Sequence, residues 1–338
     1  MSRRILLTFT AIALVAAACG SSSDTAEEPS TTLGTTTTVA STSTIAASST
    51  ASSSTTSPSP TVPESSEFPV TINAPNGPVT IETQPKNIVS LSPTSTEVLF
   101  AVGAGPQVVA VDNQSNYPTD APITDLTGFE PNLEAIAGYG ADLVVVMYDP
   151  GDVIDGLEAI GIPVIMHAAA TSLDETYTQI EQIGAATGHI EESDRLVASM
   201  KTEIDLAIAS TDGGGATYYH EVSPDLYSVT SSTFAGALYT MLGLDNIADA
   251  ADPDGYGYPQ LSAEHVLAED PALIFLADTK CCGQDAGTVA RRPGWDSLAA
   301  IQDGAVAELD DDIASRWGPR VVDFVAAIAD AVARLQNA

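Results

Sequence analysis

Apolar and polar residues alternate along the last 270 or so residues in a pattern that predicts short buried strands separated by helices. Continuous apolar runs predict strands at 88–91, 108–111, 143–146 and 163–166. Apolar positions at helical spacing predict helices near 94–102, 132–137 and 153–160. Strands that are apolar along their whole length are typical of a mostly parallel sheet covered by helices on both faces.

A hairpin is predicted ahead of the first strand of this sheet. Val70–Ile72 and Val79–Ile81 flank the sequence Pro75-Asn76-Gly77-Pro78. An Asn-Gly pair is the strongest short hairpin signal, because both residues tolerate the positive φ of the turn. We therefore expect the turn at Asn76 and Gly77.

The alternation breaks at residues 173–209. Helical spacing runs from Leu173 to Thr187, and a second apolar helical face follows Gly188 and ends at Ile208. A long helical connection without a strand is unusual inside one doubly wound sheet and favours a helix that joins two lobes. After Asp212 the strand pattern resumes at 217–219, 273–276 and 306–309, and a final amphipathic helix is expected from Pro319.

One short unit occurs on both sides of the long helix. Residues 132–136 read Asn-Leu-Glu-Ala-Ile, and residues 262–266 read Ser-Ala-Glu-His-Val. Each begins with a residue suited to an N-cap, has a glutamate in the first turn, and precedes a buried strand that starts nine residues after that glutamate. The repetition predicts two related lobes.

The N-terminal residues predict export. Arg3 and Arg4 precede an apolar run of signal-peptide length, which falls short of the roughly 18–20 residues that span a bilayer. Residues 15–20 resemble a bacterial lipobox, in which Cys19 becomes the acylated N-terminus; the alternative is an ordinary signal peptide cut near Ala18. Residues 20–66 are mostly Ser, Thr, Ala and Pro, a composition that predicts a disordered linker.

Charge and cysteine content narrow the set of partners. The net charge of −34 argues against nucleic acid and anionic lipid surfaces, so membrane contact is expected through the lipid anchor only. Beyond Cys19 the chain has only the adjacent pair Cys281 and Cys282. A vicinal disulfide that shapes a binding loop is the favoured interpretation; buried thiols or a soft-metal pair are the alternatives.

From about Pro85 to Leu335 the sequence resembles the solute-binding proteins of ABC importers for ferric siderophores, haem and cobalamin. The motifs that carry the resemblance are Pro85-Lys86-Asn87-Ile88-Val89-Ser90-Leu91-Ser92-Pro93 with Glu97, Pro131-Asn132-Leu133-Glu134, Ala141-Asp142-Leu143-Val144, Pro259-Gln260-Leu261-Ser262-Ala263-Glu264, Asp270-Pro271 and Gly318-Pro319-Arg320. Each motif is modest alone, but the ordered set is specific.

The resemblance implies an α/β fold of two Rossmann-like lobes bridged by one long α-helix, the class III type of solute-binding protein. The expected organisation is a lipoprotein signal peptide at 1–19, the linker at 20–66, an N-terminal lobe at 67–187, the bridging helix at 188–212 and a C-terminal lobe at 213–338. Glu134 and Glu264 match the two glutamates with which this family docks onto arginines of its permease. The alternative is that each carboxylate only stabilises the start of its helix.

In this family the ligand lies in the cleft between the lobes, lined by loops that follow strand ends. The expected ligand-binding residues are Tyr117, Phe129, Tyr148, His220, Glu221, Tyr227, Tyr258, Arg316 and Trp317. Five of the chain's 11 lysines and arginines lie between residues 280 and 320. This cluster, with Arg316 beside Trp317 as its best member, favours a ligand that bears carboxylates or catecholates.

Two other functions are weighed against this one. Related receptors bind bare zinc or manganese through several histidines, and His167 and His220, both at strand ends, would be the candidates here. An exported hydrolase lacks support, because no Gly-x-Ser-x-Gly, Gly-x-Gly-x-x-Gly after a strand, or His-Glu-x-x-His motif is present. No catalytic residue, no resident metal and no cofactor beyond the lipid is expected.

The sequence thus predicts a monomeric receptor, lipid-anchored on the outer face of the cytoplasmic membrane. It would capture a metal chelate and deliver it to an ABC permease and its ATPase. The expected chelate is a ferric siderophore or a corrinoid, and haem is a less favoured candidate. The cluster of basic residues favours an anionic siderophore, whereas the motifs around Glu97 and Glu264 are equally typical of cobalamin receptors.

Overall fold

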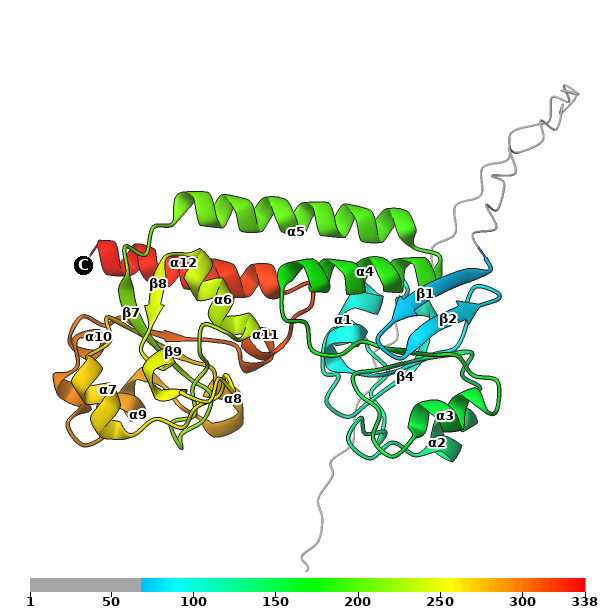
Figure 1. Ribbon diagram of the computed structural model, residues 1–338, viewed down its shortest axis with the longest axis horizontal. Helices are drawn as coiled ribbons and strands as arrows, with labels where there is room; N and C mark the ends of the chain where they lie inside the picture. Colours follow the sequence, from blue (N-terminus) through cyan, green and yellow to red (C-terminus); the bar gives the residue numbers. More distant parts are fainter. Residues whose placement is uncertain (1–67, 338) are drawn as a thin grey trace, which may run out of the picture. The chain divides into compact units, whose positions relative to one another are not determined.

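The computed structural model describes residues 68–337, all of which belong to one compact unit of the chain. The predicted signal peptide, Cys19 and the linker at 20–66 lie outside the described residues. Within them are two parallel four-stranded sheets and one antiparallel hairpin (Figure 1). The predicted fold class, two α/β lobes bridged by a long helix, is confirmed.

The first lobe contains the hairpin and the first parallel sheet, in the strand order β4-β3-β5-β6. Its strands are β1 (Val70–Ala74), β2 (Gly77–Ile81), β3 (Ile88–Leu91), β4 (Val108–Val111), β5 (Leu143–Val146) and β6 (Val164–Met166). Its helices are α1 (Pro93–Ala101), η1 (Gly105–Gln107), α2 (Leu133–Gly138), α3 (Val153–Glu158) and α4 (Leu173–Thr187).

The second lobe has the order β10-β9-β7-β8. Its strands are β7 (Ala216–Glu221), β8 (Leu244–Asn246), β9 (Leu273–Leu276) and β10 (Val306–Glu308). Its helices are α6 (Phe234–Met241), η2 (Asp249–Ala251), α7 (Ala263–Glu269), α8 (Thr279–Cys282), α9 (Ala286–Ala290), η3 (Trp295–Ser297), α10 (Ala299–Gln302), α11 (Asp311–Ser315) and α12 (Val321–Gln336).

The two parallel sheets have the same topology. In each sheet the strand that comes first in the chain lies between the second and the third strands. The fourth strand lies at the edge of the sheet, beside the third. The repeated unit that begins at Asn132 or Ser262 forms α2 before β5 in one lobe and α7 before β9 in the other, which are equivalent positions. The two related lobes expected from this repetition are therefore present.

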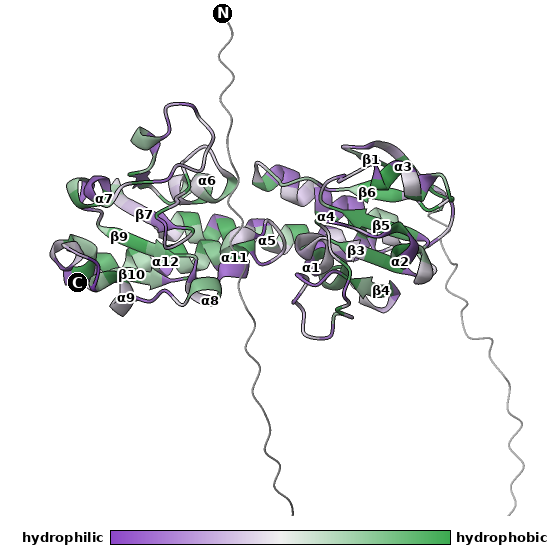
Figure 2. Ribbon diagram, turned by 90° about the horizontal axis from the view of Figure 1, so that it is seen from below, coloured by the Kyte–Doolittle hydropathy of each residue, from purple (hydrophilic) through white to green (hydrophobic). Residues whose placement is uncertain are grey.

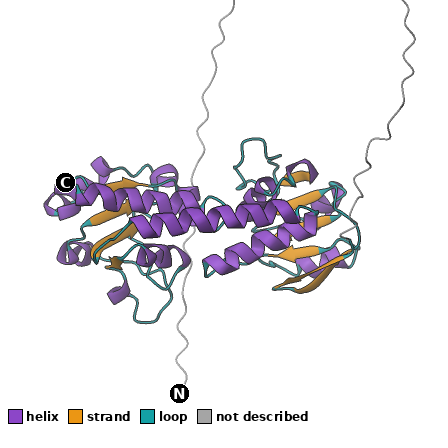
Figure 3. Ribbon diagram, turned by 90° about the horizontal axis from the view of Figure 1, so that it is seen from above, coloured by secondary structure: helices purple, strands orange, loops and turns teal. Residues whose placement is uncertain are grey.

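Helix α5 (Ile190–Ser210) connects the lobes and, at 1.5 Å per residue, is roughly 30 Å long. Its buried residues are widely spaced, from Ser193 to Ile204, so one face packs while the rest is solvated. The C-terminal helix α12 runs beside it, as Figures 1 and 3 both show. One apolar cluster includes Val98 of α1, Ile180 of α4, Met200 of α5 and Ile328 of α12. The bridge is therefore packed against both lobes.

Each sheet is buried between layers of helices, as its apolar strands predict. All four residues of β3, β5 and β9 are buried, and Figure 2 shows hydrophobic strands inside each lobe. The hairpin turn differs from the prediction. Ala74 pairs with Gly77, so the two turn residues are Pro75 and Asn76. The Asn76 amide instead ties the hairpin to β6, donating to the carbonyl of Val164 at 2.8 Å and accepting from the amide of Met166 at 3.1 Å.

Candidate functional site

Two adjoining cavities lie where the two lobes meet. One, of about 470 Å³, is lined by Leu91, Pro93, Thr94, Asp112, Gln114, Gly128, Phe129, Met147, Tyr148, Ala169, Asp312, Ser315, Arg316 and Trp317. The other, of about 480 Å³, is lined by Ala169, Ala170, Thr171, His220, Val222, Val229, Ser232, Thr233, Phe234, Ala235, Gly255, Tyr256, Gly257, Tyr258, Ala277, Ala314, Ser315 and Trp317. Because they share Ala169, Ser315 and Trp317, we treat them as one cleft.

The cleft lies at the carboxyl ends of the strands of both sheets. Leu91 ends β3, Asp112 directly follows β4 and Met147 directly follows β5, while in the second lobe His220 lies near the end of β7 and Ala277 follows β9. All of these residues line the cleft. The carboxyl ends of the strands in both sheets therefore contribute to one site, which is where open α/β sheets bind ligands.

Six aromatic side chains line the cleft, which are Phe129, Tyr148, Phe234, Tyr256, Tyr258 and Trp317. Phe129 is 64% exposed, and its ring centroid lies 6.3 Å from that of Tyr148. Gly128 lets this loop approach β3, because a Cβ atom there would lie 2.7 Å from the carbonyl oxygen of Leu91. Tyr256 and Tyr258 are also exposed on the second lobe. Such large exposed aromatic surfaces provide contact area for a bulky ligand.

The structure brings together six of the nine predicted ligand-binding residues. The cleft is lined by Phe129, Tyr148, His220, Tyr258, Arg316 and Trp317. The three others, Tyr117, Glu221 and Tyr227, do not line it. The ring of Tyr117 packs under the Arg320 guanidinium at 4.2 Å, and Glu221 is buried in an ion pair with Arg292. Whether the six contact a ligand stays a prediction.

Arg316 reaches the cleft, but its charge is already used within the protein. Its guanidinium donates to Glu97 at 2.7 Å, to Asp312 at 2.8 Å and to the carbonyl of Gln114 at 3.1 Å. Its side chain is only 9% exposed. Among the residues that line the cleft it is the only lysine or arginine. The basic cluster therefore provides no unpaired cation among the residues that line the cleft, and it supports an anionic ligand less than the sequence suggested.

Glu97 connects the lobes electrostatically. This α1 residue is 2% exposed and accepts from Arg316, and from Arg320 Nε at 2.8 Å and Arg320 Nη2 at 2.6 Å. Both arginines lie in the segment between α11 and α12 of the second lobe. Asn116 of the first lobe also donates to Asp312, at 3.1 Å. The position of the lobes thus depends on a buried carboxylate that holds two cations.

The two strand-end histidines do not meet. His167 contacts Gln182 at 2.8 Å and is not a cleft residue, whereas Nδ1 of His220 contacts the Tyr239 hydroxyl at 2.8 Å. Burial lowers the pKa of each imidazole to about 4. Both are therefore neutral at pH 7. Within residues 68–337 no group of three or more His, Cys, Asp or Glu is arranged to hold a metal ion.

A buried charge cluster lies beside the cleft in the second lobe, because Glu221 and Asp278 directly follow the cleft residues His220 and Ala277. Glu221 pairs with Arg292, whose guanidinium stacks on Trp295 at 4.6 Å. Asp278 next to them is 0% exposed, and neither of its carboxylate oxygens has a hydrogen-bond partner among the described residues. Burial, and after it the negative charge of Glu221, raises the pKa of Asp278 to about 7.

This raised pKa predicts that Asp278→Asn stabilises the protein at high pH. Between about pH 4 and pH 7 the unfolded chain loses the Asp278 proton while the folded chain keeps it, so stability falls as the pH rises. Above pH 7 the folded protein bears the full cost of burying the ionised Asp278 carboxylate. For such a pKa shift this cost is on the order of a few kcal/mol. We expect the melting temperature of Asp278→Asn to exceed that of the wild type at pH 8 and to approach it at pH 4.

The matched control is Asp254→Asn, because Asp254 is an exposed carboxylate. It should change the melting temperature equally little at both pH values. An Asp278→Asn variant that is destabilised to the same extent at pH 4 and pH 8 would contradict the assigned charge state.

Sequence reasoning missed several polar residues of the cleft, which are Thr94, Asp112, Gln114, Ser232 and Thr233. Asp112 is 2% exposed and accepts the amide of Gln114 at 2.8 Å, yet burial keeps its pKa raised. Its place directly after an apolar strand was the available signal. Without aromatic character or a motif, these residues could not be distinguished from ordinary turn residues.

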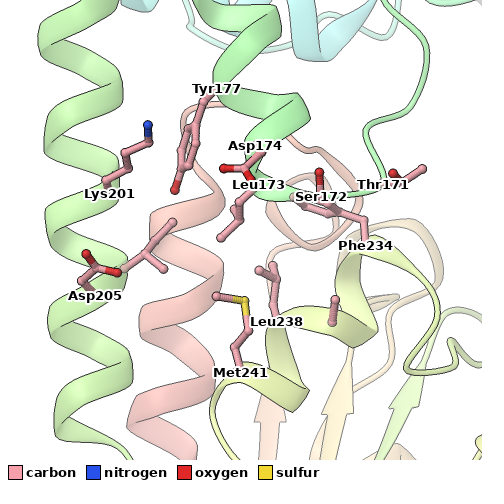
Figure 4. Close-up of a pocket in the computed structure, with 12 residues that line it drawn as sticks. Thr171, Ser172, Leu173, Asp174, Tyr177, Lys201, Asp205, Phe234, Leu238 and Met241 are labelled. Carbon is pink, nitrogen blue, oxygen red and sulfur yellow. The ribbon is translucent and has the colours of Figure 1, made fainter.

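A third cavity, of about 420 Å³, lies between α4, α5 and α6 and shares Thr171 and Phe234 with the cleft (Figure 4). Leu173, Phe234 and Leu238 form its apolar wall. The Lys201 ammonium lies over the Tyr177 ring at 4.7 Å. Helices rather than strand ends build this cavity, so we do not assign the main ligand to it.

The two predicted docking glutamates have matching surroundings. Glu134 and Glu264 are exposed first-turn residues of α2 and α7, whose N-caps are Asn132 and Ser262. Neither carboxylate forms an ion pair with any residue of the described chain. Both helices lie on the side of the lobes away from α5 (Figure 1). Their docking role stays a prediction.

The expectation of a vicinal disulfide is wrong for this structure. Cys281 and Cys282 are free, exposed thiols in the last turn of α8. The Asp311 carboxylate accepts from the backbone amides of Thr279, Lys280 and Cys281 at 2.8–3.1 Å, which stabilises helical geometry at the pair. The segment after β9 is a short helix rather than the open loop that the sequence suggested.

A two-lobed α/β fold with a cleft at its strand ends and a helical bridge is shared with solved solute-binding proteins. The chain belongs to the periplasmic binding protein family, whose model matches residues 88–313. The predicted family is thereby confirmed, and its members are solute-binding proteins of transport systems, not enzymes. No helix within residues 68–337 has the length and apolar character needed to cross a membrane.

Three similar proteins illustrate the family. A Bacillus subtilis protein named as an uncharacterized ABC transporter substrate-binding lipoprotein is 32% identical over 78% of this chain and 86% of its own length. A cobalamin-binding protein of Halobacterium salinarum is 28% identical over 78% of this chain and 74% of its own. The structure of a possible iron-binding protein from Staphylococcus epidermidis superimposes with a TM-score of 0.62 at 26% identity, covering 73% of this chain and 98% of that one.

Proposed function

We propose that this protein captures a cobalamin-type corrinoid in the interlobe cleft and delivers it to an ABC importer. The observation that carries the choice of ligand is the state of Arg316, whose guanidinium is shared by Glu97, Asp312 and a backbone carbonyl. A corrinoid with amide side chains is neutral overall and bulky, so it needs aromatic and polar contacts more than a free cation. Phe129, Tyr148 and Trp317 supply such contacts.

The relatives support the same choice. Proteins named as cobalamin-binding and vitamin B12-binding are 28% and 25% identical to this chain over 78% and 70% of its length. A ferric siderophore is the second candidate, supported by the likeness to a possible iron-binding protein. Catecholate siderophores and haem both carry negative charge, for which the cleft offers only the paired Arg316. Both are therefore less favoured.

Two features of the chain are assigned to the delivery step, the predicted lipid anchor and the two exposed glutamates. We infer that Cys19 carries a lipid that holds the monomeric receptor at the outer face of the membrane, as the lipobox resemblance implies; the Bacillus subtilis relative is named as a lipoprotein. Glu134 and Glu264 are the proposed contacts to permease arginines. Their exposure, equivalent positions and lack of ion pairs within the described lobes support this role.

The test is a titration of the purified protein with cyanocobalamin, a ferric hydroxamate, a ferric catecholate and haemin, followed by visible absorption and calorimetry. We expect saturable binding at one site for cyanocobalamin and at least tenfold weaker binding for the others. Preferential binding of a ferric chelate would replace the corrinoid assignment, while binding of none of the four would remove the proposal.

A further inference from the structure

The free thiols of Cys281 and Cys282 have no place in ligand capture or docking as described above. They lie next to each other on the surface, at the end of the four-residue helix α8. We propose that they form a reversible dithiol modification site, which is oxidised by thiol–disulfide exchange with a small-molecule or protein disulfide and then loosens the cleft wall formed by α11.

The chemistry balances with an external disulfide as the oxidant. One thiolate, which we assign to Cys282, attacks a sulfur of the oxidant and expels the first thiol. Cys281 then attacks Cys282 Sγ of the mixed disulfide and expels the second thiol. Two protein thiols lose two electrons and two protons, and the oxidant becomes two thiols. Partial desolvation, then Cys282 and Asp311, raises the pKa of Cys281 to about 12, which disfavours its thiolate and is why the first attack is assigned to Cys282. The second attack relies on the adjacency of the two cysteines in the chain.

Closing the bond is incompatible with the helix that the structure contains. Adjacent Cα atoms joined by a trans peptide are about 3.8 Å apart, whereas disulfide-linked Cα atoms are usually about 4.4–6.8 Å apart. The eight-membered ring therefore distorts the backbone of α8. A strained disulfide is also reduced more easily than a structural one, so the modification is reversible.

The backbone that must distort is bound to the cleft wall. The amides of Thr279, Lys280 and Cys281 donate to Asp311, which is the first residue of α11. The Lys280 ammonium also binds Asp310 at 2.6 Å and Asp312 at 3.0 Å. Distortion of α8 thus removes contacts that hold the start of α11.

Helix α11 and the residue that follows it also form part of the ligand site. Asp312 binds Arg316 at 2.8 Å, and Asn116 of the first lobe donates to Asp312 at 3.1 Å. Asp312, Ser315 and Arg316 all line the cleft. Oxidation is therefore expected to weaken ligand binding as well as local stability. The modification itself does not rest on the cargo, but this last effect rests on the proposed function.

The experiment incubates the full chain with oxidised glutathione and follows mass and thermal unfolding without ligand. We expect the peptide that contains both cysteines to lose the mass of two hydrogen atoms, and the protein to melt at a lower temperature. Addition of a small thiol should reverse both changes. Peptide mapping should link Cys281 to Cys282. Phenylarsine oxide, which bridges neighbouring thiols, should bind the reduced protein at one equivalent and block oxidation.

The single variants Cys281→Ser and Cys282→Ser are the matched controls, because each keeps one thiol of the pair. They should stop at a mixed disulfide with glutathione and should not bind phenylarsine oxide tightly. A wild-type protein that also stops at mixed disulfides would overturn the dithiol site. Ring closure without a change in melting temperature would overturn the coupling to α11.

Ligand affinity is measured last, with cyanocobalamin, on the reduced and oxidised protein. A drop of at least fivefold on oxidation is the expected result, and equal affinities would overturn the effect on the cleft. If the reduced protein does not bind cyanocobalamin at all, the corrinoid proposal fails, whereas the mass and melting results still decide the modification.

Discussion

Replacing Glu97 by alanine is expected to lower the free energy of unfolding by about 3–5 kcal/mol, the range for breaking a buried ion pair. The variant leaves the guanidinium groups of Arg316 and Arg320 without the carboxylate that accepts from both of them. With Glu97 itself 2% exposed, water cannot replace the lost contacts without rearranging the interface of the lobes. Denaturant unfolding of the wild type and the variant measures the difference.

Two further variants separate charge from local structure. Glu97→Gln keeps the shape and one acceptor, so an intermediate loss is expected. Glu192→Ala removes a carboxylate from an exposed ion pair, in which the side chain of Glu192 is 44% exposed and that of Arg195 is 71% exposed. It should lower the free energy of unfolding by less than about 1 kcal/mol. If Glu97→Ala costs no more than Glu192→Ala, the buried carboxylate does not hold the lobes together.

The second large effect concerns transport rather than folding. The double variant Glu134→Ala/Glu264→Ala should lose nearly all corrinoid uptake in cells that depend on this receptor, while the purified protein binds corrinoid normally. Truncating one partner of a buried charged contact costs about 2–5 kcal/mol, so each missing contact weakens docking roughly 30-fold or more. Uptake of labelled ligand and calorimetry of the purified variant measure the two parts separately.

A matched control removes two exposed carboxylates from elsewhere on the surface. Glu191→Ala/Glu203→Ala changes the net charge by the same amount but acts on α5, away from α2 and α7 (Figure 1). Uptake should stay near the wild-type level in this control. Full uptake by the Glu134→Ala/Glu264→Ala variant would show that these residues only stabilise their helices.

The positions of the main-chain elements followed closely from the sequence, because buried strands and amphipathic helices have distinct periodicities. The predicted strands at 88–91, 108–111, 143–146 and 273–276 have these bounds in the structure. The hairpin turn was misplaced because Asn76 is held by β6 rather than by the local Asn-Gly preference. A contact 88 residues away cannot be read from a four-residue signal.

The site was predicted less completely, since burial and pairing depend on contacts between lobes. Arg316 and Glu97 are 219 residues apart, and no local pattern shows that they pair. The sequence therefore suggested a free cation where the structure has a neutralised one. Aromatic residues such as the exposed Phe129 and the half-buried Trp317 were easier to identify, because loops that follow strands tend to face the ligand in this fold.

The claim that the cleft binds a corrinoid is tested most directly by calorimetric titration of cyanocobalamin into the wild type and Trp317→Ala. Trp317 lines both parts of the cleft, and its indole donates to Gln179 of the first lobe at 3.2 Å. We predict binding at one site in the wild type, weakened roughly 30-fold or more in the variant, as for a central aromatic contact worth about 2 kcal/mol. No binding to the wild type, or equal affinity in both proteins, would contradict the account.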